Sequence, residues 1–170
     1  MSERPGMKVG DREHHVQSDM LKVGDKAPAW TLTANNNAAR TSDEFAGKIK
    51  ILSIVPSLDT RVCAAQTRRF NEEASHLNEN IAVITISADL PFAQRRWCGA
   101  EGIERVLTLS CHRDMQFAND YGVHDTEWRI CQRAVFVIDA NDVVQHAEYV
   151  YNMGTEPDYI AALAAAQKLV

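Results

Sequence analysis

The residue with the clearest chemical potential is Cys63, which stands where an apolar strand gives way to a helix. The run Ile49–Val55 is short, apolar and β-branched, which predicts a strand buried in a parallel sheet. Pro56 ends the run, because proline cannot donate to a sheet ladder. A thiol in a helix's first turn faces unpaired N–H groups and the positive end of the helix dipole, and both favour the thiolate. The segment therefore predicts a nucleophilic cysteine.

The helix that would carry this cysteine is visible as a periodic stripe. Steps of four and three residues place one set on a single face: Cys63, Thr67, Phe70, Ala74 and Leu77. Asp59 or Thr60 is the expected N-cap, since both side chains accept hydrogen bonds from backbone N–H groups. The stripe predicts that Cys63 faces the protein core.

A nearby cation would favour the thiolate further, and the sequence offers two candidates. Arg61 lies in the loop before Cys63, and Arg133 lies at the start of a later strand. The local sequence does not choose between them. The competing interpretation is that Cys63 is a small buried hydrophobic residue, as free cysteines often are.

A second strand and helix follow the Cys63 helix. Ile81–Ser87 predicts another buried strand, and Asp89 as N-cap with Pro91 in the first turn begins the next helix. Cys98 falls near the end of that helix, which Gly99 and Gly102 bracket. Two strand-then-helix units imply a right-handed crossover and a parallel sheet with helices on both faces.

The rest of the chain continues this α/β pattern. We expect strands at 106–109, 134–138 and 143–150, with the last two joined by a turn at 139–142, and helices at 114–121 and from about 155–157 to 169. Residues 1–21 are polar and predict an N-terminal extension that could form a short hairpin, with His14 and His15 exposed. In the absence of repeats or a linker, residues 22–170 are expected to form one domain.

Composition narrows the class of protein. The 170 residues are 45% hydrophobic and 24% charged, as in an ordinary soluble domain with its own core. A net charge of -5 argues against nucleic acid or an anionic membrane as partner. The N-terminus shows no signal peptide and no run is long enough to span a membrane, so a cytoplasmic location is expected. Four cysteines in that compartment predict reduced thiols or a catalytic pair.

Several sequence strings resemble one family. Pro56, Thr60 and Cys63 fit the Pro-x-x-x-Thr-x-x-Cys pattern of peroxiredoxins, and residues 23–28 have their Val-Gly-Asp-x-Ala-Pro opening. The strings Pro-Ser-Leu-Asp-Thr-Arg-Val-Cys at 56–63, Ser-Ala-Asp-Leu-Pro-Phe-Ala-Gln at 87–94 and Trp-Cys-Gly-Ala-Glu-Gly at 97–102 are similar to the thiol peroxidase subfamily. The resemblance runs from about Lys22 to the C-terminus.

The resemblance implies a fold and a reaction. The fold would be thioredoxin-like, with a central mixed sheet flanked by helices and an N-terminal β-hairpin. Cys63 would reduce hydrogen peroxide and alkyl hydroperoxides, forming a sulfenic acid that Cys98 resolves to an intramolecular disulfide. Thioredoxin would reduce that disulfide, and neither a metal nor another cofactor is expected. The resemblance also implies a homodimer.

The resemblance further assigns supporting roles to three residues near Cys63. Thr60 would supply a hydroxyl that both donates and accepts hydrogen bonds, and Arg133 a fixed cation that polarises the peroxide. Pro56 would shape the loop and shield the sulfur from water.

The remaining cysteines and one loop leave questions open. Zinc binding is disfavoured because the four cysteines contain no close Cys-x-x-Cys pair. Cys131 is an alternative resolving thiol if its strand extends to Arg133, although passive roles for Cys111 and Cys131 are preferred. Residues 124–132 form a shorter segment than the resemblance leads us to expect, which leaves substrate preference and the dimer surface open.

Two other classes of function compete with the peroxidase. A peroxide sensor or thiol–disulfide relay would oxidise a partner protein, and slow recycling by thioredoxin would distinguish it. A non-catalytic binding module with a thioredoxin fold would not need Pro56, Thr60, Cys63 and Arg133 together.

Overall fold

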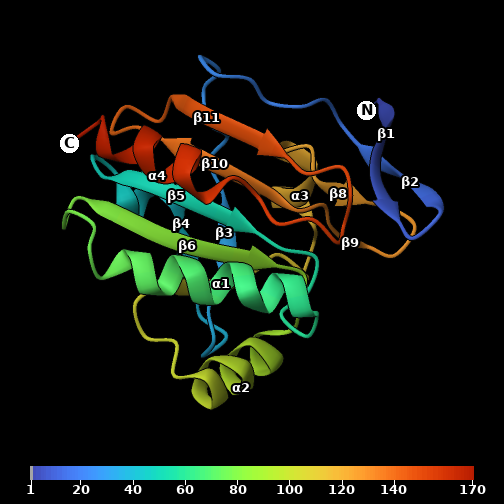
Figure 1. Cartoon of the computed structure of the whole chain (residues 1–170), viewed down its shortest axis with the longest axis horizontal. Helices are drawn as coiled ribbons and strands as arrows, with labels where there is room; N and C mark the ends of the chain where they lie inside the picture. Colours follow the sequence, from blue (N-terminus) through green and yellow to red (C-terminus); the bar gives the residue numbers. More distant parts are fainter. Residues whose placement is uncertain (1) are drawn as a thin grey trace.

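The computed structural model describes residues 2–170 and arranges them around two β-sheets (Figure 1). The larger sheet has seven strands in the order β11-β10-β5-β6-β7-β3-β4, and the smaller has four in the order β1-β2-β8-β9. The strands of the large sheet are β3 (Thr31–Thr33), β4 (Ala39–Thr41), β5 (Ile49–Ile54), β6 (Ile81–Ser87), β7 (Leu107–Ser110), β10 (Ala134–Ile138) and β11 (Val144–Tyr149). Those of the small sheet are β1 (Glu3–Val9), β2 (Arg12–Gln17), β8 (His124–Asp125) and β9 (Ile130–Cys131).

The centre of the large sheet is parallel, as the sequence predicts. β5 pairs with β6 and β6 with β7 in parallel, whereas β10 and β11 form an antiparallel hairpin beside β5. Every residue of β5 is buried, which explains its nearly continuous apolar run. The expectation of a mixed sheet flanked by helices is therefore confirmed.

Helices cover both faces of this sheet. The helices are α1 (Arg61–Ala74), α2 (Pro91–Glu101), α3 (Gln116–Asp120) and α4 (Tyr159–Gln167), with a 3-10 turn η1 at Ser42–Phe45. Side chains of α1, α2 and α4 share one hydrophobic cluster with Cys63, and α3 contributes to a second cluster that contains Cys111 and Cys131. The two clusters use alternate residues of β5 and β10, so they lie on opposite faces. The sheet thus separates Cys63 from the other cysteine pair.

The expected N-terminal hairpin is present and belongs to the small sheet. β1 and β2 are antiparallel, and β2 continues onto β8, so the extension is tied to a segment more than a hundred residues later. The expected exposure of both histidines is wrong for His14. Its side chain is fully buried and its Nδ1 lies 2.9 Å from Asp125 Oδ2, because β8 supplies a partner that the local sequence does not show. A domain boundary at residue 21 remains a prediction.

Residues 124–132 are ordered by the same sheet. β8 and β9 pair His124 with Cys131 and Asp125 with Ile130, so a short antiparallel ladder closes the turn at 126–129. Cys131 therefore ends a different strand from the one that follows Arg133, and the premise of one strand carrying both residues is wrong.

Two helices begin later than the sequence predicts. α3 starts at Gln116, because Asp114 accepts a hydrogen bond from Gln116 N and Met115 adopts a left-handed conformation with φ 57°. α4 starts at Tyr159, where Asp158 accepts from Ala161 N as the N-cap. An aspartate N-cap therefore explains the start of α4, whereas α3 starts after the left-handed Met115, which is its N-cap and makes no side-chain cap hydrogen bond.

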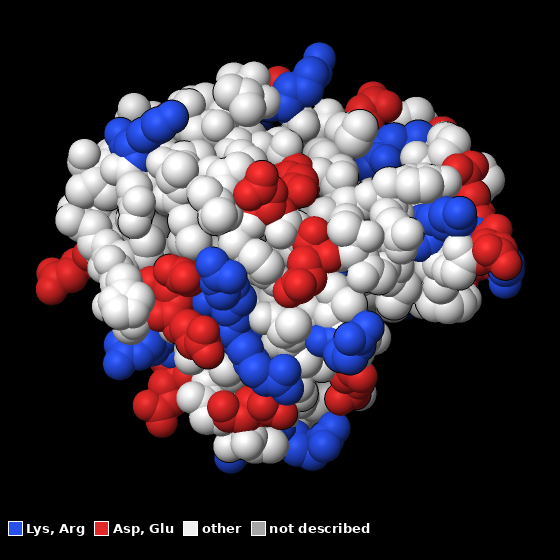
Figure 2. Space-filling view, in the orientation of Figure 1, with Lys and Arg blue, Asp and Glu red and all other residues white. Residues whose placement is uncertain are grey.

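On the face shown in Figure 2, acidic and basic side chains are interspersed, so positive and negative charges neighbour one another across α1 and α2. No helix in residues 2–170 combines the length and the apolar character that crossing a membrane requires.

Candidate active site

Cys63 occupies the place that the sequence predicts for it. It is the third residue of α1, whose N-cap is Thr60, and its side chain has no exposed surface. Backbone N–H groups in the first turn of a helix lack intrahelical partners, and the helix dipole is positive there. The sulfur is therefore held where a negative charge is stabilised.

Arg133, and not Arg61, is the arginine beside the sulfur. Its Nη2 donates to Cys63 Sγ at 3.3 Å, whereas Arg61 is exposed. Two further acceptors fix the guanidinium, since Nη1 donates to Gln66 Oε1 and Nη2 donates to Met153 O, both at 2.8 Å. Arg133 is only 1% exposed, so its charge acts in a poorly solvated environment. The structure thus settles which arginine reaches Cys63.

Gln66 is a site residue that sequence reasoning missed. It is fully buried, accepts from Arg133 and donates from Nε2 to Ser53 Oγ at 2.8 Å, which connects α1 to β5. The signal for it was its i+3 spacing from Cys63 on the helix, which puts both on one face. A buried glutamine on an otherwise apolar stripe calls for a polar partner.

Thr60 and Pro56 lie in the loop that leads into α1. Pro56 is buried, and the half-buried Thr60 donates from Oγ1 to Ser57 O at 3.1 Å. A hollow of about 250 Å³ borders this loop and is lined by Thr60, Arg61, Val62, Val9, Gly10, Met153 and Gly154. The loop therefore borders a mostly apolar hollow beside the first turn of α1, which carries Cys63.

Asp89 holds the same loop from the neighbouring strand-to-helix connection. Its carboxylate accepts from Ser57 Oγ at 2.7 Å, from Leu58 N at 2.9 Å and from Ser87 Oγ at 2.7 Å. The prediction that Asp89 caps α2 is wrong: the N-cap is Leu90, and no side chain caps that end. The carboxylate instead accepts hydrogen bonds from the loop before α1, which lies far away in sequence.

Replacing this carboxylate should weaken the reaction with peroxide that the sequence resemblance implies, without unfolding the protein. Asp89→Asn keeps the size but removes the negative charge and replaces one acceptor oxygen with an NH₂ donor, so the hydrogen bonds that hold the Cys63 loop become weaker. We expect kcat/KM for peroxide to fall about tenfold, since small displacements at reacting atoms are costly. Stopped-flow peroxide reduction measures this, with the exposed Glu79→Gln as control. Equal activity of both variants and the wild type would contradict the role.

Cys98 lies in the last turn of α2 and is half-buried. Its Sγ is 3.5 Å from Thr108 Oγ1, and it packs against the same hydrophobic cluster as Cys63. Burial raises the pKa of the Cys98 thiol above its ordinary value of 9.0, although hydrogen bonds with Thr108 and Asn35 act in the opposite direction. An ion pair between Arg68 and Glu101 at 2.9 Å joins α1 to α2, the helices that carry the two cysteines (Figure 1).

The structure describes all four cysteines as free thiols. Cys63 and Cys98 share one cluster, while Cys111 and Cys131 contact each other in the second. Within residues 2–170 there is no group of three His, Cys, Asp or Glu side chains that could hold a metal ion.

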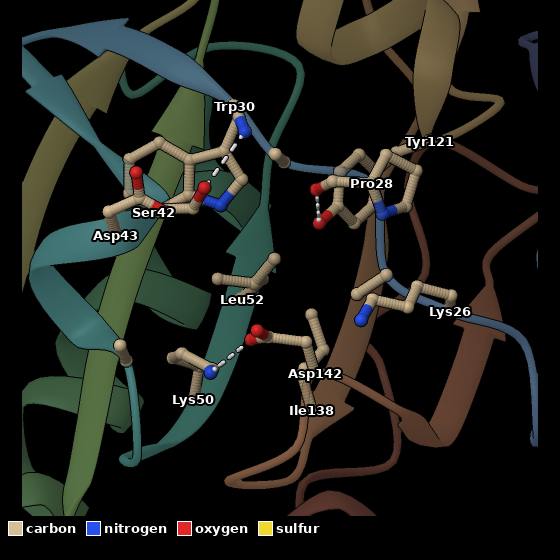
Figure 3. Close-up of a pocket in the computed structure, with 13 residues that line it drawn as sticks. Lys26, Pro28, Trp30, Ser42, Asp43, Lys50, Leu52, Tyr121, Ile138 and Asp142 are labelled. Carbon is tan, nitrogen blue, oxygen red and sulfur yellow. Dashed lines mark hydrogen bonds and ion pairs between the residues drawn. The ribbon is translucent and has the colours of Figure 1, made fainter.

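A separate cavity of about 370 Å³ lies between η1, β5 and the β10–β11 turn (Figure 3). Lys50 and Asp142 at its wall form an ion pair of 2.7 Å, and Tyr121 donates to Pro28 O at 2.7 Å. Lys50 and Asp142 therefore neutralise each other at the cavity wall. Neither Arg133 nor any of the cysteines lines this cavity.

Comparisons with known proteins show the family to which this chain belongs. The family model described as Redoxin matches residues 22–163. A thiol peroxidase of Streptococcus sanguinis is 54% identical over 149 residues, covering 88% of this chain and 91% of the relative. A thiol peroxidase of Bacillus subtilis (strain 168) is 51% identical over 150 residues, covering 88% of this chain and 89% of the relative.

Solved structures show the same fold. A peroxiredoxin-like protein from Aquifex aeolicus superposes with a TM-score of 0.90 at 29% identity, covering 99% of each chain. A thiol peroxidase from Chromobacterium violaceum superposes with a TM-score of 0.85 at 23% identity, covering 95% of each chain. The expected thioredoxin-like fold, as peroxiredoxins elaborate it, is confirmed.

Proposed function

The chain belongs to the Redoxin family and is an enzyme of the thiol peroxidase type, and we propose that Cys63 is the residue that reduces the peroxide. The observation that carries this assignment is the 3.3 Å contact between Arg133 Nη2 and Cys63 Sγ in the first turn of α1. A fixed cation and a helix N-terminus together favour the thiolate, which is the nucleophilic form of cysteine.

In the first step the Cys63 thiolate attacks one oxygen of a hydroperoxide. An S–O bond forms and the O–O bond breaks, so the sulfur is oxidised to a sulfenic acid and the other oxygen leaves as an alcohol or water after taking a proton. Arg133 stabilises the charge that develops on the oxygens. The Thr60 hydroxyl orients the peroxide, and Pro56 limits the water that reaches the sulfur.

The hollow beside Thr60 is the proposed entrance for the peroxide. Its lining is largely apolar, with Val9, Val62 and Met153 among its residues. An apolar wall binds the organic part of an alkyl hydroperoxide while its peroxide group points at the polar end of α1. Alkyl hydroperoxides and hydrogen peroxide are therefore the proposed substrates.

Cys98 is the proposed resolving residue. Its thiol attacks the Cys63 sulfenic acid, which forms a disulfide and releases water. Because Cys63 is buried in the first turn of α1 and Cys98 lies in the last turn of α2, we expect both turns to unwind when the two residues form a disulfide, which requires close Cα atoms. Gly102, the C-cap of α2, is left-handed with φ 66° and ends the helix shortly after Cys98, so only the last turn of α2 has to open.

The resolving step should show a pH dependence that Thr108 controls. A thiol with a raised pKa is mostly protonated at neutral pH, so disulfide formation should accelerate as pH rises from 7 toward 9. Thr108→Val removes a bond that lowers the Cys98 pKa, so the profile shifts to higher pH and the rate at pH 7 falls about fivefold. Rapid-quench alkylation measures this rate.

The matched control is Thr85→Val, a buried threonine on β6 whose hydroxyl has no hydrogen-bond partner within residues 2–170. It should leave the profile unchanged. A pH-independent resolving rate in the wild type would contradict a protonated Cys98.

Thioredoxin is the proposed reductant, and steady-state peroxide consumption coupled to thioredoxin tests the function. The wild type should turn over many times, while Cys98→Ser should reduce one equivalent of peroxide and then stop, because its sulfenic acid has no internal thiol partner. Rapid oxidation of the wild type without recycling would instead support a peroxide sensor.

A homodimer and a cytoplasmic location are further proposals from the family resemblance. Leu90 and Phe92 are 52% and 66% exposed next to Asp89, and they offer apolar surface for a partner close to the Cys63 loop. Light scattering of the reduced protein measures the oligomeric state.

A further inference from the structure

Cys111 and Cys131 form a second pair of thiols away from Cys63. Their sulfur atoms lie 3.5 Å apart, and Met115 Sδ lies 3.9 Å from Cys111 Sγ. Cys111 is 3% exposed and Cys131 is fully buried, in the cluster on the other face of the sheet from Cys63. The proposed peroxidase cycle uses neither residue.

Their surroundings favour a neutral product over a charged one. The neighbours in the cluster are apolar, and the hydrogen bond with Cys111 together with burial raises the pKa of the Cys131 thiol well above its ordinary value. Two thiolates holding a metal would place charge in this cluster, which is costly. A disulfide carries no charge and needs the sulfurs to approach from 3.5 Å to about 2.05 Å.

The two residues also belong to different parts of the fold. Cys111 follows β7 of the large sheet and donates from its backbone N–H to Ser87 O at 3.0 Å. Cys131 ends β9 at the edge of the small sheet, two residues before Arg133. A bond between them would join the two sheets covalently.

We propose that Cys111 and Cys131 are a second redox couple, which a hydroperoxide converts slowly to an internal disulfide that cross-links the two sheets. One sulfur attacks the peroxide, becoming a sulfenic acid as the O–O bond breaks and an alcohol or water leaves. The second thiol attacks that sulfur, forming the S–S bond and releasing water. One hydroperoxide is reduced by two electrons and two thiols are oxidised, so the step balances.

Access sets the rate of this reaction. β8 and β9 have two residues each, and the turn between them, 126–129, is exposed. Opening of so short an edge ladder costs less than global unfolding and would expose Cys131. The couple therefore reacts after Cys63, when peroxide is in excess.

The test uses Cys63→Ser/Cys98→Ser, which leaves only this pair of cysteines and makes the result independent of the proposed peroxidase cycle. Treatment with millimolar hydrogen peroxide should remove two hydrogens from the intact mass, and peptide mapping should link Cys111 to Cys131. The oxidised protein should unfold at a temperature higher by on the order of 5 °C, and dithiothreitol should reverse the shift.

A matched control adds Cys131→Ala, which should abolish both the mass change and the thermal shift. The wild type provides a second measurement in case these variants fold poorly. After one equivalent of peroxide, an excess should remove two further hydrogens, with the same Cys111–Cys131 link. Two thiols that remain fully alkylatable after denaturation, a stable oxygen adduct without the link, or only intermolecular disulfides would each overturn the proposal.

Discussion

Cys63→Ser is expected to reduce peroxide consumption to less than about 10⁻⁴ of the wild-type rate, because a serine hydroxyl is a far weaker nucleophile than a thiolate at neutral pH. The substitution is nearly isosteric, and its Oγ can still accept from Arg133, which donates to the cysteine sulfur at 3.3 Å in the wild type. The fold should therefore persist while the chemistry is lost. Thioredoxin-coupled turnover with hydrogen peroxide and an alkyl hydroperoxide measures the loss.

Cys111→Ala is the matched control for this variant, since it removes a different buried thiol, on the other face of the sheet. It should retain turnover within about twofold, because ordinary core truncations act on stability more than on a distant reaction. Circular dichroism should show both variants folded. Peroxide turnover near the wild-type level in Cys63→Ser would mean that another thiol is the nucleophile.

Arg133→Lys is expected to lower kcat/KM for peroxide about 10²-fold, the scale of losing one preorganised donor to a developing anion. Lysine keeps the positive charge but lacks the planar fork that contacts Cys63, Gln66 and Met153 together. Charge alone therefore does not restore the geometry. Stopped-flow oxidation of the reduced enzyme isolates this step from recycling.

The same substitution should also lower the free energy of unfolding by about 1 to 3 kcal/mol, because Gln66 Oε1 or Met153 O loses a buried donor. Arg95→Lys on the exposed surface of α2 is the matched control and should change neither quantity. An Arg133→Lys variant with a wild-type oxidation rate would show that Arg133 only supports the fold.

The sequence predicts local features of this protein well. The β-branched run before Pro56 and the stripe that begins at Cys63 correspond to β5 and α1, because a buried parallel strand and an amphipathic helix both leave periodic patterns. The strand Ile81–Ser87 is predicted at its observed bounds for the same reason. Hence the position of Cys63 at a helix N-terminus could be read directly.

Long-range contacts were beyond the reach of the sequence pattern. Asp89 looks like a helix cap from its neighbours, yet its carboxylate binds Ser57 and Leu58, about thirty positions away in the chain. His14 looks exposed until β8 supplies Asp125. The choice of Arg133 over Arg61 likewise depends on how β10 packs beside β5, since no local signal reports which side chain crosses to the sulfur.

In the proposed cycle Cys63 takes an oxygen from the peroxide and Cys98 resolves the sulfenic acid. The most direct measurement is the intact mass of reduced wild-type protein after one equivalent of hydrogen peroxide, under non-reducing conditions, followed by peptide mapping. We predict the loss of two hydrogens with Cys63 linked to Cys98. A stable added oxygen on Cys63 would contradict the role of Cys98, and an unmodified Cys63 would contradict the proposal that Cys63 reduces the peroxide.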